Sequence, residues 1–181
     1  MSVFKKALLL ILTFVCAASF AQTSKEIIIL PNIGIDDIEI GQTKIEDLST
    51  FRGELLRTKT HTTIRCGTGR KRKERGFRAR FTNRISEDLG IVFTFTEKEL
   101  HRRKELWSIP ELTSITIAGS IRTYDGISVG SSTKNDVLAV YGPLPNGWDH
   151  EAYIYFNEQG IAFDFNENGT LTRIKVFKIR S

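Results

Sequence analysis

Two stretches of the chain alternate apolar and polar residues with the period of a β-strand. Apolar residues take every second position in both, as Ile91, Phe93 and Phe95 and as Ile161, Phe163 and Phe165. A period of two places these side chains on one face of a strand. The residues 166–169 (NENG) form a turn sequence, and 170–179 return as a second strand. The pattern predicts β-hairpins with one apolar face.

Two other stretches change to helical spacing. Apolar residues recur every three or four positions within 44–51 and within 133–141. Thr43 with Glu46, and Ser132 with Asn135, have the spacing of a helix N-cap and its partner. Gly142 and Pro143 end the second stretch. We therefore expect two short amphipathic helices.

These segments recur in the same order, as an internal repeat. Residues 38–53 align with 127–142, 90–97 with 160–167, and 112–117 with 171–176, with 12 of 30 positions identical. The repeat predicts an α+β fold with two tandem helix-plus-hairpin units, 22–120 and 121–181. Their strands are expected to form an antiparallel sheet with the short helices packed on one face, and Thr94, Asp164, Arg173 and Lys175 are expected exposed on one sheet face.

The first unit carries a long insertion that is strongly basic. It has 36 residues between Gly53 and Gly90, where the second unit has 17 between Gly142 and Gly160. Residues 65–84 contain nine basic residues and one acidic residue, and the alternation predicts strands at 54–65 and 77–82 joined by a turn. The candidate binding residues on this basic hairpin are Arg70, Lys71, Arg72, Lys73, Arg75, Arg78 and Arg80. Such a hairpin either attracts an acidic protein or anionic envelope component, or is a solvated edge.

The first 21 residues have the pattern of a secretory signal peptide. Lys5 and Lys6 precede an apolar run at 7–18, and Ser19 and Ala21 are the small residues of a cleavage site. Removal of this segment lowers the formal net charge from +5 to +3, because it contains two lysines and no acidic residue. We expect a periplasmic or secreted protein with no later transmembrane segment and no nucleic-acid partner. A lipoprotein anchored through Cys16 is the alternative.

Candidate catalytic and metal-binding residues are few. Only Cys66 remains after cleavage, so an internal disulfide is not expected, although pairing between chains stays open. His61, His101 and His150 lie in separate segments without metal-ligand spacing. No cofactor motif is present. Asp149, His150 and Glu151 are consecutive and are expected to form a polar loop.

Residues 126–143 (GISVGSSTKNDVLAVYGP) resemble the signature of the β-lactamase-inhibitor-protein-like fold, which the SmpA/OmlA outer-membrane lipoproteins share. The first unit departs from it, with Arg52 and Glu54 in place of Tyr141 and Pro143. The resemblance implies tandem α/β units and roles in protein binding or envelope assembly. We expect an exported, non-enzymatic protein-binding module of the inhibitor, immunity or assembly-accessory type. The alternative is a periplasmic or secreted enzyme with a cleft between the two units.

Overall fold

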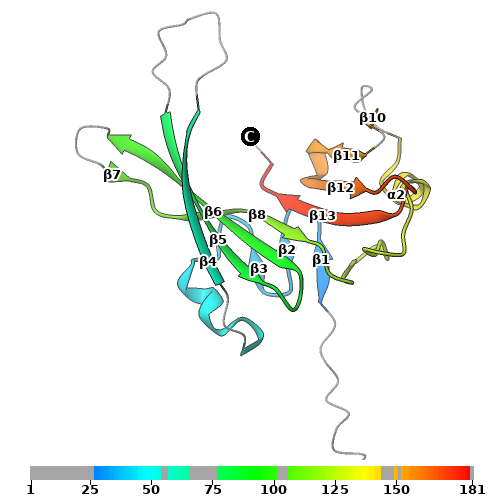
Figure 1. Ribbon diagram of the computed structural model, residues 1–181, viewed down its shortest axis with the longest axis horizontal. Coiled ribbons are helices and arrows are strands. Elements are labelled where there is room, and N and C mark those ends of the chain that lie inside the picture. The colour runs from blue at the N-terminus through cyan, green and yellow to red at the C-terminus, as the bar shows by residue number, and fades with distance from the viewer. Residues whose placement is uncertain are drawn as a thin grey trace, which may run out of the picture.

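The computed structural model shows a mixed α+β protein that consists mostly of two β-sheets (Figure 1). It describes residues 27–53, 57–65, 77–101, 106–143, 149–150 and 152–179. The expected signal peptide, both cysteines and residues 66–76 of the basic hairpin lie outside these ranges. Within the described residues, no helix has the length and hydropathy to cross a membrane.

The larger sheet has nine strands, and all its pairs are antiparallel. Its order is β10-β11-β12-β13-β8-β6-β5-β4, with β7 paired to β6. The strands are β4 (Arg57–Arg65), β5 (Phe77–Ser86), β6 (Ile91–His101), β7 (Leu106–Trp107), β8 (Glu111–Ile117), β10 (Asp149–His150), β11 (Tyr153–Phe156), β12 (Ile161–Phe165) and β13 (Leu171–Phe177). The adjacent β8 and β13 join the two halves of the chain in one sheet.

The smaller sheet has the order β3-β2-β1-β9. It consists of β1 (Ile28–Leu30), β2 (Gly34–Ile35), β3 (Ile38–Glu39) and β9 (Arg122–Thr123), and β1 pairs with β9 in parallel. The sequence prediction of an antiparallel sheet missed this second sheet. Its strands have two or three residues, too few for the alternation of apolar and polar residues to be visible.

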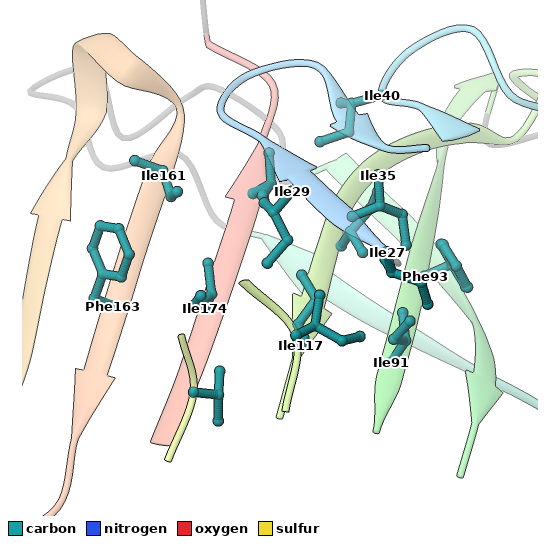
Figure 2. Packing of buried hydrophobic residues seen from close by; sticks show 14 of the residues in the cluster. Ile27, Ile29, Ile35, Ile40, Ile91, Phe93, Ile117, Ile161, Phe163 and Ile174 are labelled. Atoms are coloured by element: carbon teal, nitrogen blue, oxygen red, sulfur yellow. The ribbon is translucent and has the colours of Figure 1, made fainter. Parts of the chain in front are cut away.

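The core lies between the larger sheet and the elements that cover one of its faces. Figure 2 shows Ile29 and Ile35 of the smaller sheet directed toward Ile117 and Ile174 of the larger one. All four side chains have no exposed surface. Apolar area removed from water supplies most of the stability of such a core.

Two short helices contribute side chains to this core. The 3-10 helix η1 (Glu46–Gly53) buries Leu48 and Phe51, and the ring of Phe51 meets that of Phe93 edge-on at 5.2 Å. The α-helix α2 (Lys134–Tyr141) buries Val137, and its last residue packs its ring against Phe163 at 5.0 Å. A third short helix, η4 (Asn157–Gln159), connects β11 to β12.

The start of α2 differs from the predicted one by one residue. Thr133 is the N-cap of α2 and forms a capping box with Asp136, whereas Ser132 and Asn135 were predicted. Ser132 instead accepts a hydrogen bond from the backbone N–H of Ser128. The predicted cap of α2 was wrong because the hydroxyl residues 131–133 are consecutive, and the preceding turn uses Ser132.

The same hydrogen bonds occur at two places in the chain. The backbone N–H of Gly41 donates to Leu112 at 2.8 Å, and that of Gly130 donates to Leu171 at 2.8 Å. Both glycines have φ of +84°. The backbone geometry before each helix is therefore alike, although η1 is a 3-10 helix and α2 is an α-helix.

The two hairpins that follow are also alike. Gly90 and Gly160 precede β6 and β12 with φ of +62° and +64°. Each glycine carbonyl accepts a backbone hydrogen bond from the end of the return strand, from Ala118 at 2.8 Å and from Phe177 at 2.9 Å. The register of each hairpin shifts at one point, at Thr94/Phe95 and at Asp164/Phe165. These positions are the ones that the sequence alignment pairs.

Candidate functional site

One face of the larger sheet lines a broad hollow, which we call the open face. Along β6, Phe93 and Phe95 point into the core, and Thr94, Thr96 and Lys98 between them point the other way. The hollow has a volume of about 1300 Å³. Its lining residues come from β4, β5, β6, β8, β11 and β13 and from the segments beside them, and include His61, Ala79, Phe81, Asn83, Ser108, Ile109, Glu111, Thr116, Tyr155, Lys175, Phe177 and Lys178.

Hydroxyl groups form the floor of the hollow. Thr94 pairs across strands with Ser114, and Thr96 and Thr113 are hydrogen bonded through their hydroxyls at 2.8 Å. The hydroxyl of Thr113 also lies 3.2 Å from the carbonyl oxygen of Thr94, where the strand register shifts. Because a hydroxyl offers one donor and two acceptor sites, these groups retain capacity for a ligand.

Stacked ring pairs lie at the two ends of the hollow. On β4 and β5, the rings of His61 and Phe81 are 5.3 Å apart and 19° from parallel. On β11 and β13, the rings of Tyr155 and Phe177 are 4.7 Å apart and 17° from parallel. Tyr155 is 40% exposed and covers Phe177, which is buried. Rings held in this way offer apolar area with little loss of side-chain entropy on binding, which suits a contact surface.

Positive charge exceeds negative charge in the hollow. Its lining contains Lys98, Lys175 and Lys178 against one carboxylate, Glu111, which accepts a hydrogen bond from Lys178. On the same face, Arg173 donates to Asp164 at 2.5 Å, so that pair is close to neutral. The open face therefore favours a ligand with negative charge near Lys98 and Lys175.

The structure places Thr94, Asp164, Arg173 and Lys175 on one sheet face, as the alternation predicted. Lys175 and Arg173 are exposed, and the other two side chains are half-buried. Sequence reasoning missed Phe81, Tyr155 and Phe177. The sequence contains the information needed to find them. Each of the three rings is an even number of positions away from a polar residue that lines the hollow, on its own strand or directly after it, so alternation places it on the same face.

Most of the candidate basic residues cannot be placed on this surface. Arg70, Lys71, Arg72, Lys73 and Arg75 lie outside the described residues, and the structure describes the backbone of Arg78 but not its side chain.

The remaining candidate, Arg80, lies on the opposite face of β5 from the hollow. Its guanidinium lies 4.4 Å from the ring centroid of Trp107 and 3.7 Å from the carboxylate of Glu97. These contacts fix the side chain on the outer part of the sheet, away from the stacked rings. Among the described residues, the structure does not bring Arg80 into the open face.

In the part of the chain that the structure describes, the titratable groups with shifted pKa values lie in α2. Burial raises the pKa of Tyr141 to about 12, and its hydroxyl donates to Asp125 at 3.3 Å. Hydrogen bonds from Thr133 lower the pKa of Asp136. Both groups belong to α2 and its contacts. Neither side chain lines the hollow.

The other chemical candidates do not converge. His61 is part of a stacked pair, and Cys66 lies outside the described residues. Asp149 and His150 form the short strand β10 instead of the predicted polar loop, and Glu151 is not described. In the described ranges, no group of three or more His, Cys, Asp or Glu residues is arranged to hold a metal ion. The open face can hydrogen bond, stack and attract anions.

Comparisons with protein-family models, with curated proteins and with solved structures found no match to this chain.

Proposed function

We propose that this chain is an exported protein-binding module and that the open face of its larger sheet is the contact surface. The observation that carries the proposal is the combination of two stacked ring pairs, a hydroxyl floor and an excess of lysine on one uncovered sheet face. Ring-bearing residues are enriched at protein interfaces, and polar groups around them set orientation.

The size of the open face supports a macromolecular partner. β11 and β4 are the first and last of seven consecutive strands, so Tyr155 and His61, the outer members of the two ring pairs, lie about 29 Å apart along the sheet at the usual strand spacing. A standard protein interface covers about 800 Å² on each partner, whereas a small-molecule site encloses its ligand. A sheet face on which residues of β4, β5, β6, β8, β11 and β13 line one hollow fits the first description. The lysine excess favours an acidic partner.

We further propose that the chain contains two copies of one unit, 22–120 and 121–181, as the β-lactamase-inhibitor-protein-like resemblance implies. Support comes from the paired hydrogen bonds at Gly41 and Gly130 and from the paired turns at Gly90 and Gly160. Because β8 and β13 are adjacent, both units would contribute to one binding surface. This arrangement accounts for a ring pair at each end.

The basic hairpin residues, Arg70 to Arg75 and Arg78, remain a proposed second contact, which would attract the same acidic partner from a distance by their summed charge. Periplasmic or secreted localisation is likewise a proposal. It rests on the signal-peptide pattern of residues 1–21. Together these features favour an inhibitor, immunity or envelope-assembly accessory role.

The test is capture of a partner from envelope extract and culture medium, read by mass spectrometry. The open-face variant Tyr155→Ala/Lys175→Glu changes one ring and one lysine of the hollow. The matched control Tyr124→Ala/Lys44→Glu changes the same residue types at exposed positions that do not line it.

Wild type and the control should capture the same acidic protein, and the open-face variant should lose it by at least about tenfold, as expected when a central ring and a charge are removed together. All three proteins should melt at similar temperatures. Equal capture by the open-face variant would show that the partner binds elsewhere. A proteome-wide lack of specific capture would contradict the proposal of a binding module.

A further inference from the structure

The strand β4 forms one edge of the larger sheet, and its outer side has no strand partner among the described residues. All nine of its residues pair with β5 in one continuous register, without the shift seen in the pairs of β6 with β8 and of β12 with β13. An edge strand leaves alternate backbone N–H and C=O groups unpaired. β4 therefore presents an uninterrupted backbone edge of nine residues.

Both sides of this edge are accessible. The five side chains from Arg57 to His61 are all exposed, whichever face of the strand they occupy. Thr60 and Thr82 are hydrogen bonded at 3.3 Å on one face, and His61 stacks on Phe81 on the other. Since exposure does not alternate here, no described element covers residues 57–61 of β4.

The chemistry of β4 alternates even though its exposure does not. Arg57, Lys59 and His61 point to the side of the hollow, and Thr58 and Thr60 point to the other side. The rest of the strand, 62–65, reads TTIR, so β4 contains no acidic residue. Arg57 has an ion pair with Glu87 at 3.0 Å, and Lys59 is the exposed cation at the middle of the accessible segment.

A second copy of the chain fits this edge poorly in the register that pairs all nine residues. Antiparallel pairing of two β4 strands about His61 would place Arg57 opposite Arg65 in both directions. Like charges in directly opposed positions destabilise a strand pair. An acidic strand would instead place negative charge opposite the basic residues of β4, which stabilises the pair.

We propose that β4 binds an extended acidic segment of another protein as an additional antiparallel strand. The segment would carry acidic residues at every second position, on the side of Lys59 and His61, and uncharged β-branched residues on the side of the threonines. Backbone hydrogen bonds provide affinity in this mode, and the alternate side chains provide specificity. The proposal concerns the sheet edge: His61 belongs to both surfaces, but Lys59 does not line the hollow.

The probe is a labelled nine-residue peptide of alternating Glu and Thr with blocked ends, titrated into the full chain and followed by fluorescence anisotropy. Two further peptides carry N-methyl groups on all Glu or on all Thr residues. Both peptides keep every charge. Because alternate residues of a strand direct their N–H groups toward the same neighbour, only one of the two peptides loses the amide donors that face β4. A third control has the same composition with the Glu residues in one block.

We expect one N-methylated peptide to bind at least about tenfold more weakly than the parent and the other to bind normally, because several backbone hydrogen bonds of about 1 kcal/mol each are lost from one edge only. The block peptide should also bind at least about tenfold more weakly, because its charges miss the alternation. The variant Lys59→Glu should weaken binding, and Lys134→Glu, at the far end of the sheet in α2, should not (Figure 1).

Equal binding of both N-methylated peptides would overturn the proposal, because attraction would then come from charge alone. Loss of the peptide in Tyr155→Ala/Lys175→Glu with retention in Lys59→Glu would place the peptide in the hollow and also overturn it. A wild-type dimer in sedimentation that Lys59→Glu disperses would identify the edge as an interface between copies. None of these results depends on whether a protein partner of the open face has been found.

Discussion

The two faces of the larger sheet come from the same strands and have opposite chemistry. On the covered face, Ile91, Phe93 and Ile117 have no exposed surface. On the open face, Thr94, Thr96 and Thr116 line the hollow from the same strands. Alternate residues of one strand can thus carry stability and recognition separately. Substitutions on the open face can therefore change the partner with little effect on the fold.

The largest expected effect follows from neighbouring residues on β6. Phe93→Ala should lower the free energy of unfolding by about 3–5 kcal/mol, because it leaves a cavity under Phe51. Thr94→Ala should lower it by less than about 1 kcal/mol, since it removes a half-buried side chain from the open face. Urea denaturation of both variants measures the difference. Equal losses would show that the open face is packed against something and that the two faces are not separate.

The next effect concerns the turn that sets the register of β12. Gly160→Ala places a methyl group 2.7 Å from the carbonyl oxygen of Phe177, at a φ of +64°. The left-handed conformation alone costs about 1–2 kcal/mol, and the backbone clash adds to it. Gly169→Ala is the control, because its φ of +74° is similar and nothing lies within 4 Å of the added carbon. Thermal unfolding should rank wild type, Gly169→Ala and Gly160→Ala in decreasing stability, and equal losses would contradict the clash.

The sequence predicted the longer elements well because their patterns are local. The alternation over Ile91–Phe95 and over Ile161–Phe165 specifies which side chains share a face, whatever the strands pair with. The smaller sheet was missed because Ile28–Leu30 is a continuous apolar run, and its parallel partner β9 lies about ninety residues later in the chain. Such pairing depends on tertiary contacts that a local pattern does not contain.

The candidate site was predictable only in part for the same reason. Alternation indicated that Thr94 and Lys175 face away from the apolar side, and the register agrees. The strand order, with β8 between β6 and β13, is a long-range property. His61 and Tyr155 therefore line one hollow although 94 positions separate them in the sequence.

A smaller effect tests how α2 is held over the covered face. Thr133→Ala should cost about 1 kcal/mol, because it removes the N-cap hydroxyl, whereas Asn135→Ala should be neutral or slightly stabilising at an exposed helical position. Hydrogen bonds from Thr133 lower the pKa of Asp136 in the folded state. The stabilisation from the Asp136 carboxylate is therefore present above the unfolded pKa of 3.8 and is lost as pH falls from there through the lower folded pKa. Urea midpoints at neutral and acidic pH check both statements. A larger loss of stability in Asn135→Ala than in Thr133→Ala would instead support the predicted cap, Ser132 with Asn135.

We expect the smallest effect on stability when lysines of the open face are replaced. The same replacements should have the clearest effect on recognition. Lys98 and Lys175 are exposed, and Lys98→Glu/Lys175→Glu should change the free energy of unfolding by less than about 0.5 kcal/mol. The same change reverses the sign of the charge excess in the hollow, so association with the captured partner should slow strongly at low salt. At ionic strengths where the Debye length falls to about 3 Å, near 1 M, the two rates should converge. Lys44→Glu/Lys134→Glu changes the net charge equally but lies outside the hollow, and should leave the rate closer to that of wild type. Stopped-flow measurements of the three proteins at both salt concentrations separate local from overall charge: equal slowing in the two double variants would mean that net charge, not the open face, attracts the partner.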